Sequence, residues 1–149
     1  MKALIVYDSV YGNTEKIARA IAEAIAPSGE VKVVGADEAN PSELESIDLL
    51  IVGSPTHGGR PTPAVQNLLN KVPKLQGIKV AAFDTRIPTK LVRVFGYAAG
   101  RIANNLKKKG STLIASPEGF FVTGGQGPLK EGELERAAAW AKGILESKK

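Results

Sequence analysis

Residues 3–14 read ALIVYDSVYGNT, and this stretch decides the fold. Its first five residues are apolar, a continuous run that is typical of a β-strand buried on both faces. A short polar loop follows, and the chain then enters residues 17–25, where apolar side chains recur at helical spacing until Pro27 and Gly29 stop them. A buried strand, a polar loop and a helix in immediate succession predict the first unit of an α/β sheet.

The same alternation continues along the rest of the chain. Apolar runs predict strands at 31–34, 49–53 and 80–83, and helical stripes predict helices at 65–72, 97–109 and 134–145. Residues 112–115 and 119–122 compete for, or share, a fifth strand. Strands that alternate with helices form a mostly parallel sheet covered on both faces, so we predict one domain over residues 1–149. Ligands of such sheets bind at the carboxyl ends of the strands, which places the site in the loops after strands one, three and four.

Composition excludes several kinds of function. The chain has 149 residues, a net charge of +5, one histidine and no cysteine, so we expect neither thiol chemistry nor a metal site. The sequence pI near 9.5 raises nucleic acid as a partner, but aromatic content is only 5% and no nucleic-acid motif is present, so we expect none. No segment approaches the roughly 20 apolar residues of a membrane span, and the start lacks a secretory pattern. We therefore expect a cytoplasmic protein without a membrane partner.

The loop after the first strand is rich in hydrogen-bonding groups. The hydroxyls of Ser9, Tyr11 and Thr14 and the amide of Asn13 gather at the start of a helix, where free N–H groups and the helix dipole favour an anion. Gly12 lets the backbone approach a ligand closely. The loop has no lysine or arginine and lacks the Gly-Lys-Ser/Thr of nucleotide P-loops, so it suits one terminal phosphate better than a magnesium-bound triphosphate. The alternative is a simple helix cap.

The pattern Ser9-x-Tyr11-Gly12-Asn13-Thr14 resembles the phosphate loop of flavodoxins, Ser/Thr-x-Thr-Gly-Asn-Thr, with a tyrosine in place of the middle threonine. This variant is similar to that of the flavodoxin-like domains of flavodiiron proteins. The resemblance implies a short-chain flavodoxin fold with five parallel strands in the order 2-1-3-4-5. It also implies non-covalent FMN, with its phosphate held by the loop residues Ser9, Val10, Tyr11, Gly12, Asn13 and Thr14. A receiver domain shares this fold but needs an acidic residue after the third strand, where this chain has Gly53 and Ser54.

By the same resemblance, two further loops flank the flavin ring. The residues implied are Pro55, Thr56, His57, Gly58 and Gly59 after the third strand, and Asp84, Thr85 and Arg86 after the fourth. Two adjacent glycines permit a peptide flip beside the flavin. His57 either is solvated or contacts the flavin edge, and we assign no catalytic residue.

The aromatic residues differ from the flavodoxin pattern. Flavodoxins commonly hold the ring between a tryptophan in the earlier loop and a tyrosine in the later one, and neither is present here. Trp140 lies in the last predicted helix, where we expect it to pack in the core. Tyr97 and Phe95 lie too far along the chain to be assigned to the ring.

The charge distribution is unusual for the family, whose members are typically acidic. Residues 85–117 carry seven basic residues and no acid. We predict that residues 107–109 form a solvated helix end, and that Arg86, Lys90 and Arg93 lie near the flavin. These three cations would make the flavin easier to reduce and favour acidic redox proteins as docking partners, or an anionic substrate.

Together these observations predict an FMN-binding electron-transfer protein that shuttles electrons between redox proteins, as a monomer or homodimer, rather than a stand-alone enzyme. Two alternatives remain. One is an FMN-dependent NAD(P)H oxidoreductase acting on quinone-type acceptors, with a dimer completing its substrate pocket. The other is a flavin-free interaction module that has kept the fold.

Overall fold

A single parallel sheet organises the chain in the computed structural model, which describes residues 1–57, 59–88 and 97–147. Its strands are β1 (Lys2–Tyr7), β2 (Glu30–Gly35), β3 (Leu49–Pro55), β4 (Lys79–Arg86), β5 (Thr112–Leu113) and β6 (Glu118–Phe121). They lie in the order β2-β1-β3-β4, with both β5 and β6 paired to β4. The expected order 2-1-3-4-5 is therefore confirmed.

Two segments share the fifth strand position, which is one of the two arrangements expected for residues 112–115 and 119–122. Residues 79–80 pair with β5, and residues 83–86 pair with β6 further along the same strand. Pro117 separates β5 from β6, and a proline lacks the N–H that an unbroken ladder would need there.

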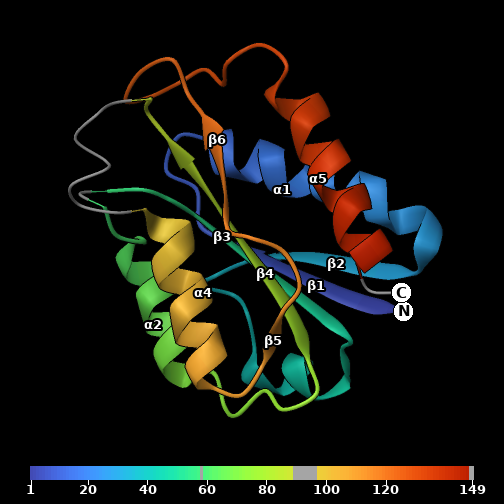
Figure 1. The fold of residues 1–149 in the computed structure, drawn as a ribbon. Helices are drawn as coiled ribbons and strands as arrows, with labels where there is room; N and C mark the ends of the chain where they lie inside the picture. The colour runs from blue at the N-terminus through green and yellow to red at the C-terminus, as the bar shows by residue number, and fades with distance from the viewer. Residues whose placement is uncertain (58, 89–96, 148–149) are drawn as a thin grey trace.

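Helices cover both faces of the sheet (Figure 1). Helices α1 (Asn13–Ile25) and α5 (Glu133–Ser147) lie side by side on one face, and α2 (Pro63–Lys71) and α4 (Ala98–Lys108) lie on the other. Two short 3-10 helices, η1 (Ala26–Ser28) and η2 (Pro41–Ser46), complete the connections around β2. No helix of the described residues is long and apolar enough to cross a lipid bilayer.

Alternate residues of the central strands build two apolar layers. Leu4 and Leu50 belong to the layer beneath α2 and α4, whereas Ile5 and Ile51 belong to the layer beneath α1 and α5. This is why those strands read as continuous apolar runs. Trp140 packs in the second layer, edge-on to the rings of Phe83 and Phe120 at centroid distances of 6.2 and 6.0 Å, which confirms its expected packing role.

The end of α4 differs in part from the expected solvated run of lysines. Lys107 and Lys108 are exposed, but Lys109 is only half-exposed, and its ammonium donates to the carbonyls of Leu69 and Val72 at 2.5 and 2.7 Å. These carbonyls lie at the end of α2, where the helix leaves acceptors unpaired. Lys109 therefore ties the two helices of this face together.

Candidate functional site

The carboxyl ends of β1, β3, β4 and β6 meet at one edge of the sheet and enclose a pocket of about 140 Å³. Ten of the residues expected at the site line it: Ser9, Val10, Tyr11, Asn13, Thr14, Pro55, Thr56, His57, Thr85 and Arg86. Gly12, Gly59 and Asp84 lie in the same loops without lining the pocket, and Gly58 lies outside the described residues. Pockets for drug-sized ligands are commonly about 300–1,000 Å³, so these residues would enclose a mononucleotide only in part.

The loop before α1 presents donors to this pocket. Gly12 has φ +90°, a conformation that favours glycine, and its N–H donates to Ser9 Oγ at 3.0 Å. The N–H of Glu15 also reaches Ser9 Oγ, at 3.4 Å, so the hydroxyl keeps its own hydrogen for a ligand. The N–H groups of Asn13 and Thr14 donate to no acceptor among the described residues, as expected at the first turn of a helix.

A buried pair of hydroxyls joins the first loop to the end of β4. Thr14 Oγ1 and Thr85 Oγ1 lie 2.8 Å apart, and both side chains are buried. Two hydroxyls carry two hydrogens and their mutual bond uses one, so one hydrogen remains to be donated. The loop therefore offers an anion several neutral donors.

Residues 122–129 form a fourth wall of the site, which the sequence analysis missed. Val122 and Gly125 line the pocket, and the carbonyl of Gln126 accepts from Asn13 Nδ2 at 3.2 Å. Gly127 has φ +94°, and a Cβ there would lie 2.5 Å from the same Asn13 nitrogen. The signal was present in the glycine-rich run at 124–127, which directly follows β6 at the carboxyl edge.

Arg86 is held in an ion pair, which corrects the premise that it supplies an uncompensated cation. Its Nε and Nη2 donate to the two carboxylate oxygens of Asp84 at 2.6 and 2.7 Å. The guanidinium carbon lies 3.2 Å from the ring centroid of Tyr97, and it fills the space that a Cβ on Gly119 would take. The other two cations of the expected patch, Lys90 and Arg93, lie outside the described residues.

The side chains of Asp84 and Thr56 also hold the start of α4. The N–H of Ala99 donates to Asp84 Oδ2 at 2.9 Å, and that of Ala98 donates to Thr56 Oγ1 at 3.2 Å. Burial raises the pKa of the fully buried Asp84 carboxyl, and Arg86, Ala99 and Thr56 pull it back towards its usual value. Asp84 thus links the pocket, through Arg86, to the helix behind it.

The turn after β3 is narrow and closed by its own backbone. His57 and Arg60 exchange hydrogen bonds of 2.9 and 3.0 Å, and Gly59 between them has φ +79°. The carbonyl of Gly59 accepts from Arg101 Nε of α4 at 2.9 Å. His57 is exposed and lines the pocket, so it lies within reach of both solvent and a bound ligand.

Exposed apolar side chains gather at the same pocket. Of the described residues, four large hydrophobic ones are exposed, and three of them, Val10, Tyr11 and Ile87, line it. Their exposed fractions are 51%, 55% and 42%. An exposed apolar patch beside polar groups marks a place where a ligand or partner covers the protein.

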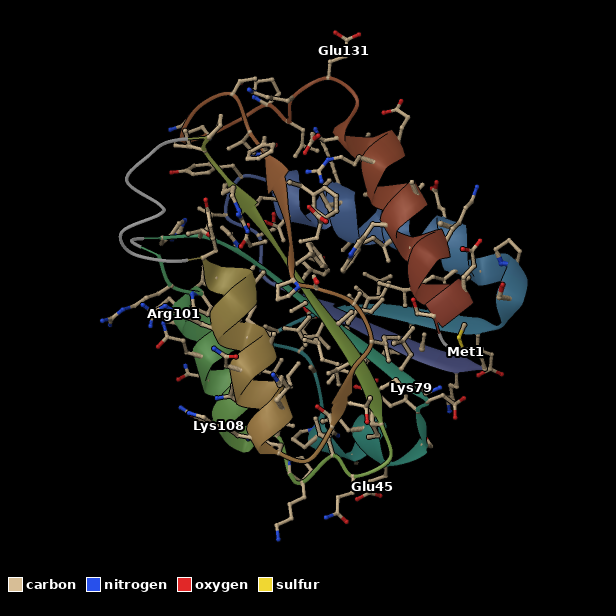
Figure 2. The ribbon with its side chains drawn as sticks, viewed as in Figure 1. Met1, Glu45, Lys79, Arg101, Lys108 and Glu131 are labelled. Carbon is tan, nitrogen blue, oxygen red and sulfur yellow. The ribbon has the colours of Figure 1, made fainter. Side chains whose placement is uncertain are left out.

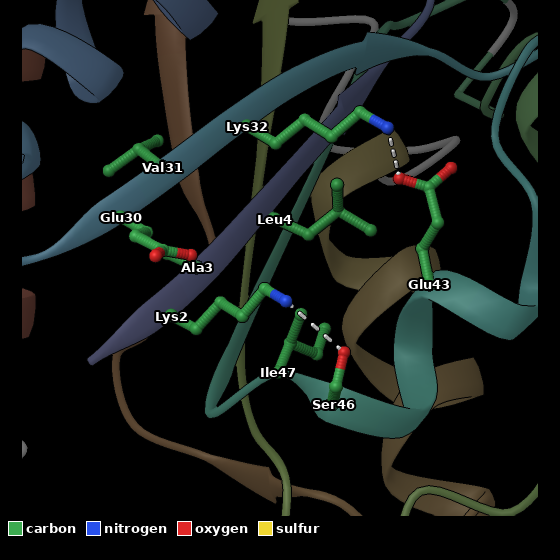
Figure 3. A pocket seen from close by; sticks show the side chains of 9 residues that line it. All are labelled: Lys2, Ala3, Leu4, Glu30, Val31, Lys32, Glu43, Ser46 and Ile47. Atoms are coloured by element: carbon green, nitrogen blue, oxygen red, sulfur yellow. Dashed lines mark hydrogen bonds and ion pairs between the residues drawn. The ribbon is translucent and has the colours of Figure 1, made fainter.

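A larger hollow of about 480 Å³ lies elsewhere, against the start of β1, the edge strand β2 and η2 (Figure 3). Its cations already have partners, because Lys32 Nζ pairs with Glu43 at 2.6 Å and Lys2 Nζ reaches Ser46 Oγ at 3.4 Å. It also lies away from the carboxyl edge, so it is not the candidate site. The described residues contain no group of three or more histidine, aspartate or glutamate side chains placed to hold a metal ion.

A donor-rich loop at the carboxyl edge of a doubly wound parallel sheet defines the class of α/β proteins that bind a phosphorylated ligand. The flavodoxin family model matches residues 5–140, and the chain belongs to the flavodoxin family. FMN is the cofactor that this family binds. A curated relative, putative diflavin flavoprotein A 4 of Synechocystis sp., is 33% identical over 121 residues, which cover 74% of this chain and 19% of the relative. The chain spans 11–19% of the length of the curated relatives it matches.

Solved structures agree with the fold. Oxidised flavodoxin 2 from Bacillus cereus superposes with a TM-score of 0.82 at 26% identity, covering 98% of this chain and 99% of that one. Rubredoxin oxygen:oxidoreductase from Desulfovibrio gigas superposes with a TM-score of 0.79 at 26% identity, over 98% of this chain and 35% of that one.

The residues present fit FMN on three counts. The uncharged donors of the first loop suit a phosphate, and the cradle around Asn13 is kept open by Gly127, where a side chain would collide. The exposed apolar surface of Val10, Tyr11 and Ile87 suits an aromatic ring.

Proposed function

We propose that this chain binds FMN in the pocket at the carboxyl edge and carries electrons between redox proteins. The observation that carries the proposal is the gathering of exposed Val10, Tyr11 and Ile87 around a loop of neutral phosphate donors. A simple helix cap would explain the donors, but not the exposed apolar side chains beside them. Both the flavodoxin family and the relatives named diflavin flavoproteins support a flavin in this position.

The residues divide the binding between them. Ser9, Thr14 and the free N–H groups at the start of α1 would hold the phosphate, and Val10, Tyr11 and Ile87 would cover the ring system. FMN, when bound, supplies the ability to accept and release one or two electrons. The protein's part is to bind and orient it and to leave part of it accessible, which the small enclosed volume favours.

Arg86 does not support the expectation of an easily reduced flavin. That expectation relied on the positive charges of Arg86, Lys90 and Arg93, and the charge of Arg86 is balanced by Asp84. The side-chain exposed fraction of Arg86 is only 13%, so it is also a poor contact for an acidic protein. Among the described residues, a docking surface for such a partner would have to use cations other than Arg86.

Titration with FMN, followed by flavin fluorescence and visible absorption, tests the proposal. Replacing Ser9 with alanine removes a donor to a charged group, so FMN affinity should fall about tenfold or more. Ser46→Ala, which changes the same residue type at the other end of the sheet, should bind as the wild type does. A protein without affinity for FMN would overturn the proposal and favour a flavin-free module. Rapid reduction of bound FMN by NAD(P)H alone would replace the carrier with an oxidoreductase.

A further inference from the structure

One face of the molecule is almost entirely basic. Residues 49–117 contain eleven lysines and arginines and one acid, Asp84, which is buried and paired with Arg86. Helices α2 and α4 lie within this stretch and contain four basic residues and no acid. On the opposite face, α1 and α5 together contain five acids and four bases. The net positive charge of the described helices therefore lies on the α2/α4 face, because the other face has as many bases but five acids.

A groove runs between these two helices and reaches the turn after β3. Its cavity is about 230 Å³ and is lined by Arg60, Pro61, Gln66, Leu69, Asn70, Arg101 and Asn105. Arg60 closes the turn that carries His57 into the FMN pocket, and Arg101 bonds the Gly59 carbonyl of that turn. The groove therefore begins beside the proposed flavin site.

A further cation lies on the same side of α4, beyond the residues that line the groove. Residues 101, 105 and 108 recur at helical spacing, which places them on one side of α4. Figure 2 shows Arg101 and Lys108 projecting on the side of α4 where α2 lies. Arg60 and Lys108 are exposed, and neither forms an ion pair with a described residue. One exposed cation, Arg60, therefore lines the groove, and a second, Lys108, lies further along the same side of α4.

The floor of the groove holds an acceptor without a donor. Asn105 Oδ1 is buried and has no hydrogen-bond partner among the described residues. A buried polar atom left in this way destabilises the folded protein, and a ligand that donates a hydrogen bond to it would recover that loss. The ligand that fits this groove must therefore offer both an acceptor for the Arg60 guanidinium and a donor for Asn105.

The geometry points to a docking site for an acidic polypeptide segment, whose carboxylate pairs with Arg60 and whose backbone N–H donates to Asn105. This inference rests on the proposed function, because it names the class of the redox partner and places it beside the flavin pocket. Nucleic acid fits less well, since α2 and α4 contain no aromatic residue on which bases could stack.

The test measures anisotropy of a short fluorescein-labelled, glutamate-rich peptide against the full chain, with and without FMN. Arg60→Glu places like charges together and should weaken peptide binding about tenfold at low salt, with a smaller effect at high salt. The matched control is Lys142→Glu, an exposed lysine of α5 on the opposite face, which should bind as the wild type does. Equal effects of these two variants would overturn the inference, because they would show unspecific attraction.

A second variant separates a docking role from a structural one. Asn105→Leu removes the unpaired acceptor, so it should weaken peptide binding without lowering the free energy of unfolding measured in urea. Unchanged peptide affinity in this variant would overturn the inference. A single-stranded oligonucleotide of matched charge is the competing probe. If the protein binds this oligonucleotide more tightly than the peptide, the inference is also overturned.

FMN titration of the same variants distinguishes the two proposals. Neither Arg60 nor Asn105 lines the FMN pocket, so both variants should keep wild-type FMN affinity. A wild type that binds the peptide but not FMN would overturn the proposed function and the role of the segment as a redox partner, while the acidic docking site would stand. A wild type that binds FMN but not the peptide would overturn the docking site alone.

Discussion

Replacing Arg86 with glutamine should make the stability of this protein depend more steeply on pH, between pH 5 and pH 7, than that of the wild type. The substitution leaves Asp84 as a fully buried carboxylate with two neutral donors but no cation. Breaking a buried ion pair in this way costs about 3–5 kcal/mol. The carboxyl can avoid the penalty only by taking up a proton, so its pKa in the folded variant is raised further by burial.

The free-energy cost of protonating Asp84 sets an upper limit on the stability lost through its buried charge in the Arg86→Gln variant. An aspartate with an ordinary pKa of about 3.9 costs about 1.36 kcal/mol to protonate for each pH unit above that value. The penalty from the buried charge is therefore at most about 4 kcal/mol at pH 7 and at most about 1.5 kcal/mol at pH 5. A raised pKa in the folded state gives stability that is present at low pH and lost as pH rises through that pKa. The variant should accordingly lose more stability at pH 7 than at pH 5, by up to about 2.7 kcal/mol.

Urea unfolding of wild type and variant at pH 5 and pH 7 measures this difference directly. Lost packing of Arg86 on Tyr97 affects both pH values equally, so it cancels in the comparison. The double variant Asp84→Asn with Arg86→Gln removes the carboxyl and should show no such pH dependence. Equal losses for Arg86→Gln at both pH values would refute the reasoning, because they would mean that Asp84 carries no buried charge.

Three further predictions follow from individual contacts. Thr85→Val removes one of the two paired pocket hydroxyls and should weaken FMN binding about tenfold in a fluorescence titration, with the fold kept. Gly127→Ala should weaken FMN binding and destabilise the protein by about 1–3 kcal/mol, because the added Cβ would collide with Asn13 and because φ is positive at this position. The control Gly124→Ala adds a Cβ that meets only ordinary contacts, so FMN affinity and stability should stay as in the wild type. Arg136, by hydrogen bonding, lowers the pKa of Glu133, so Glu133 contributes stability above its unfolded pKa of about 4.3 that is lost as pH falls. Glu133→Gln should therefore be less sensitive to acid than wild type in urea unfolding between pH 6 and about pH 3.5, and an equal sensitivity would contradict the assignment.

Local patterns were sufficient for the architecture and for one wall of the site. The first strand, the first helix and the loop between them were predicted from the apolar run at 3–7 and the polar loop at 8–14. A strand buried on both faces and a helix start each require a particular pattern of consecutive residues, and that pattern is present in the sequence. The apolar runs at 112–115 and 119–122 were expected to compete for, or share, a fifth strand, and the structure shows that they share its position. Trp140 was assigned to the core because its neighbours repeat at helical spacing.

Charge pairing was predicted less well from the sequence than the strands and helices were. The basic stretch after β4 predicted an open cationic patch, yet Arg86 turns back onto Asp84, which lies two residues earlier on the same strand. Lys109 was expected in solvent and instead binds the end of α2. The partner of Lys109 is set by the position of α2, which no local periodicity records. Arg86 and Asp84 are two residues apart and share one face of β4, so their pairing could have been read from the sequence.

The sequence by itself therefore determined the class of fold, the family and the loop that we propose for the phosphate, since each depends on residues that are neighbours along the chain. Only the tertiary structure decided how Asp84 holds the start of α4, how residues 122–129 close the pocket against Asn13, and how Arg60 and Asn105 come to share a groove. These contacts join residues up to more than one hundred positions apart. They arise because strands from distant parts of the chain end at one edge of the sheet, and that convergence exists only once the sheet has formed.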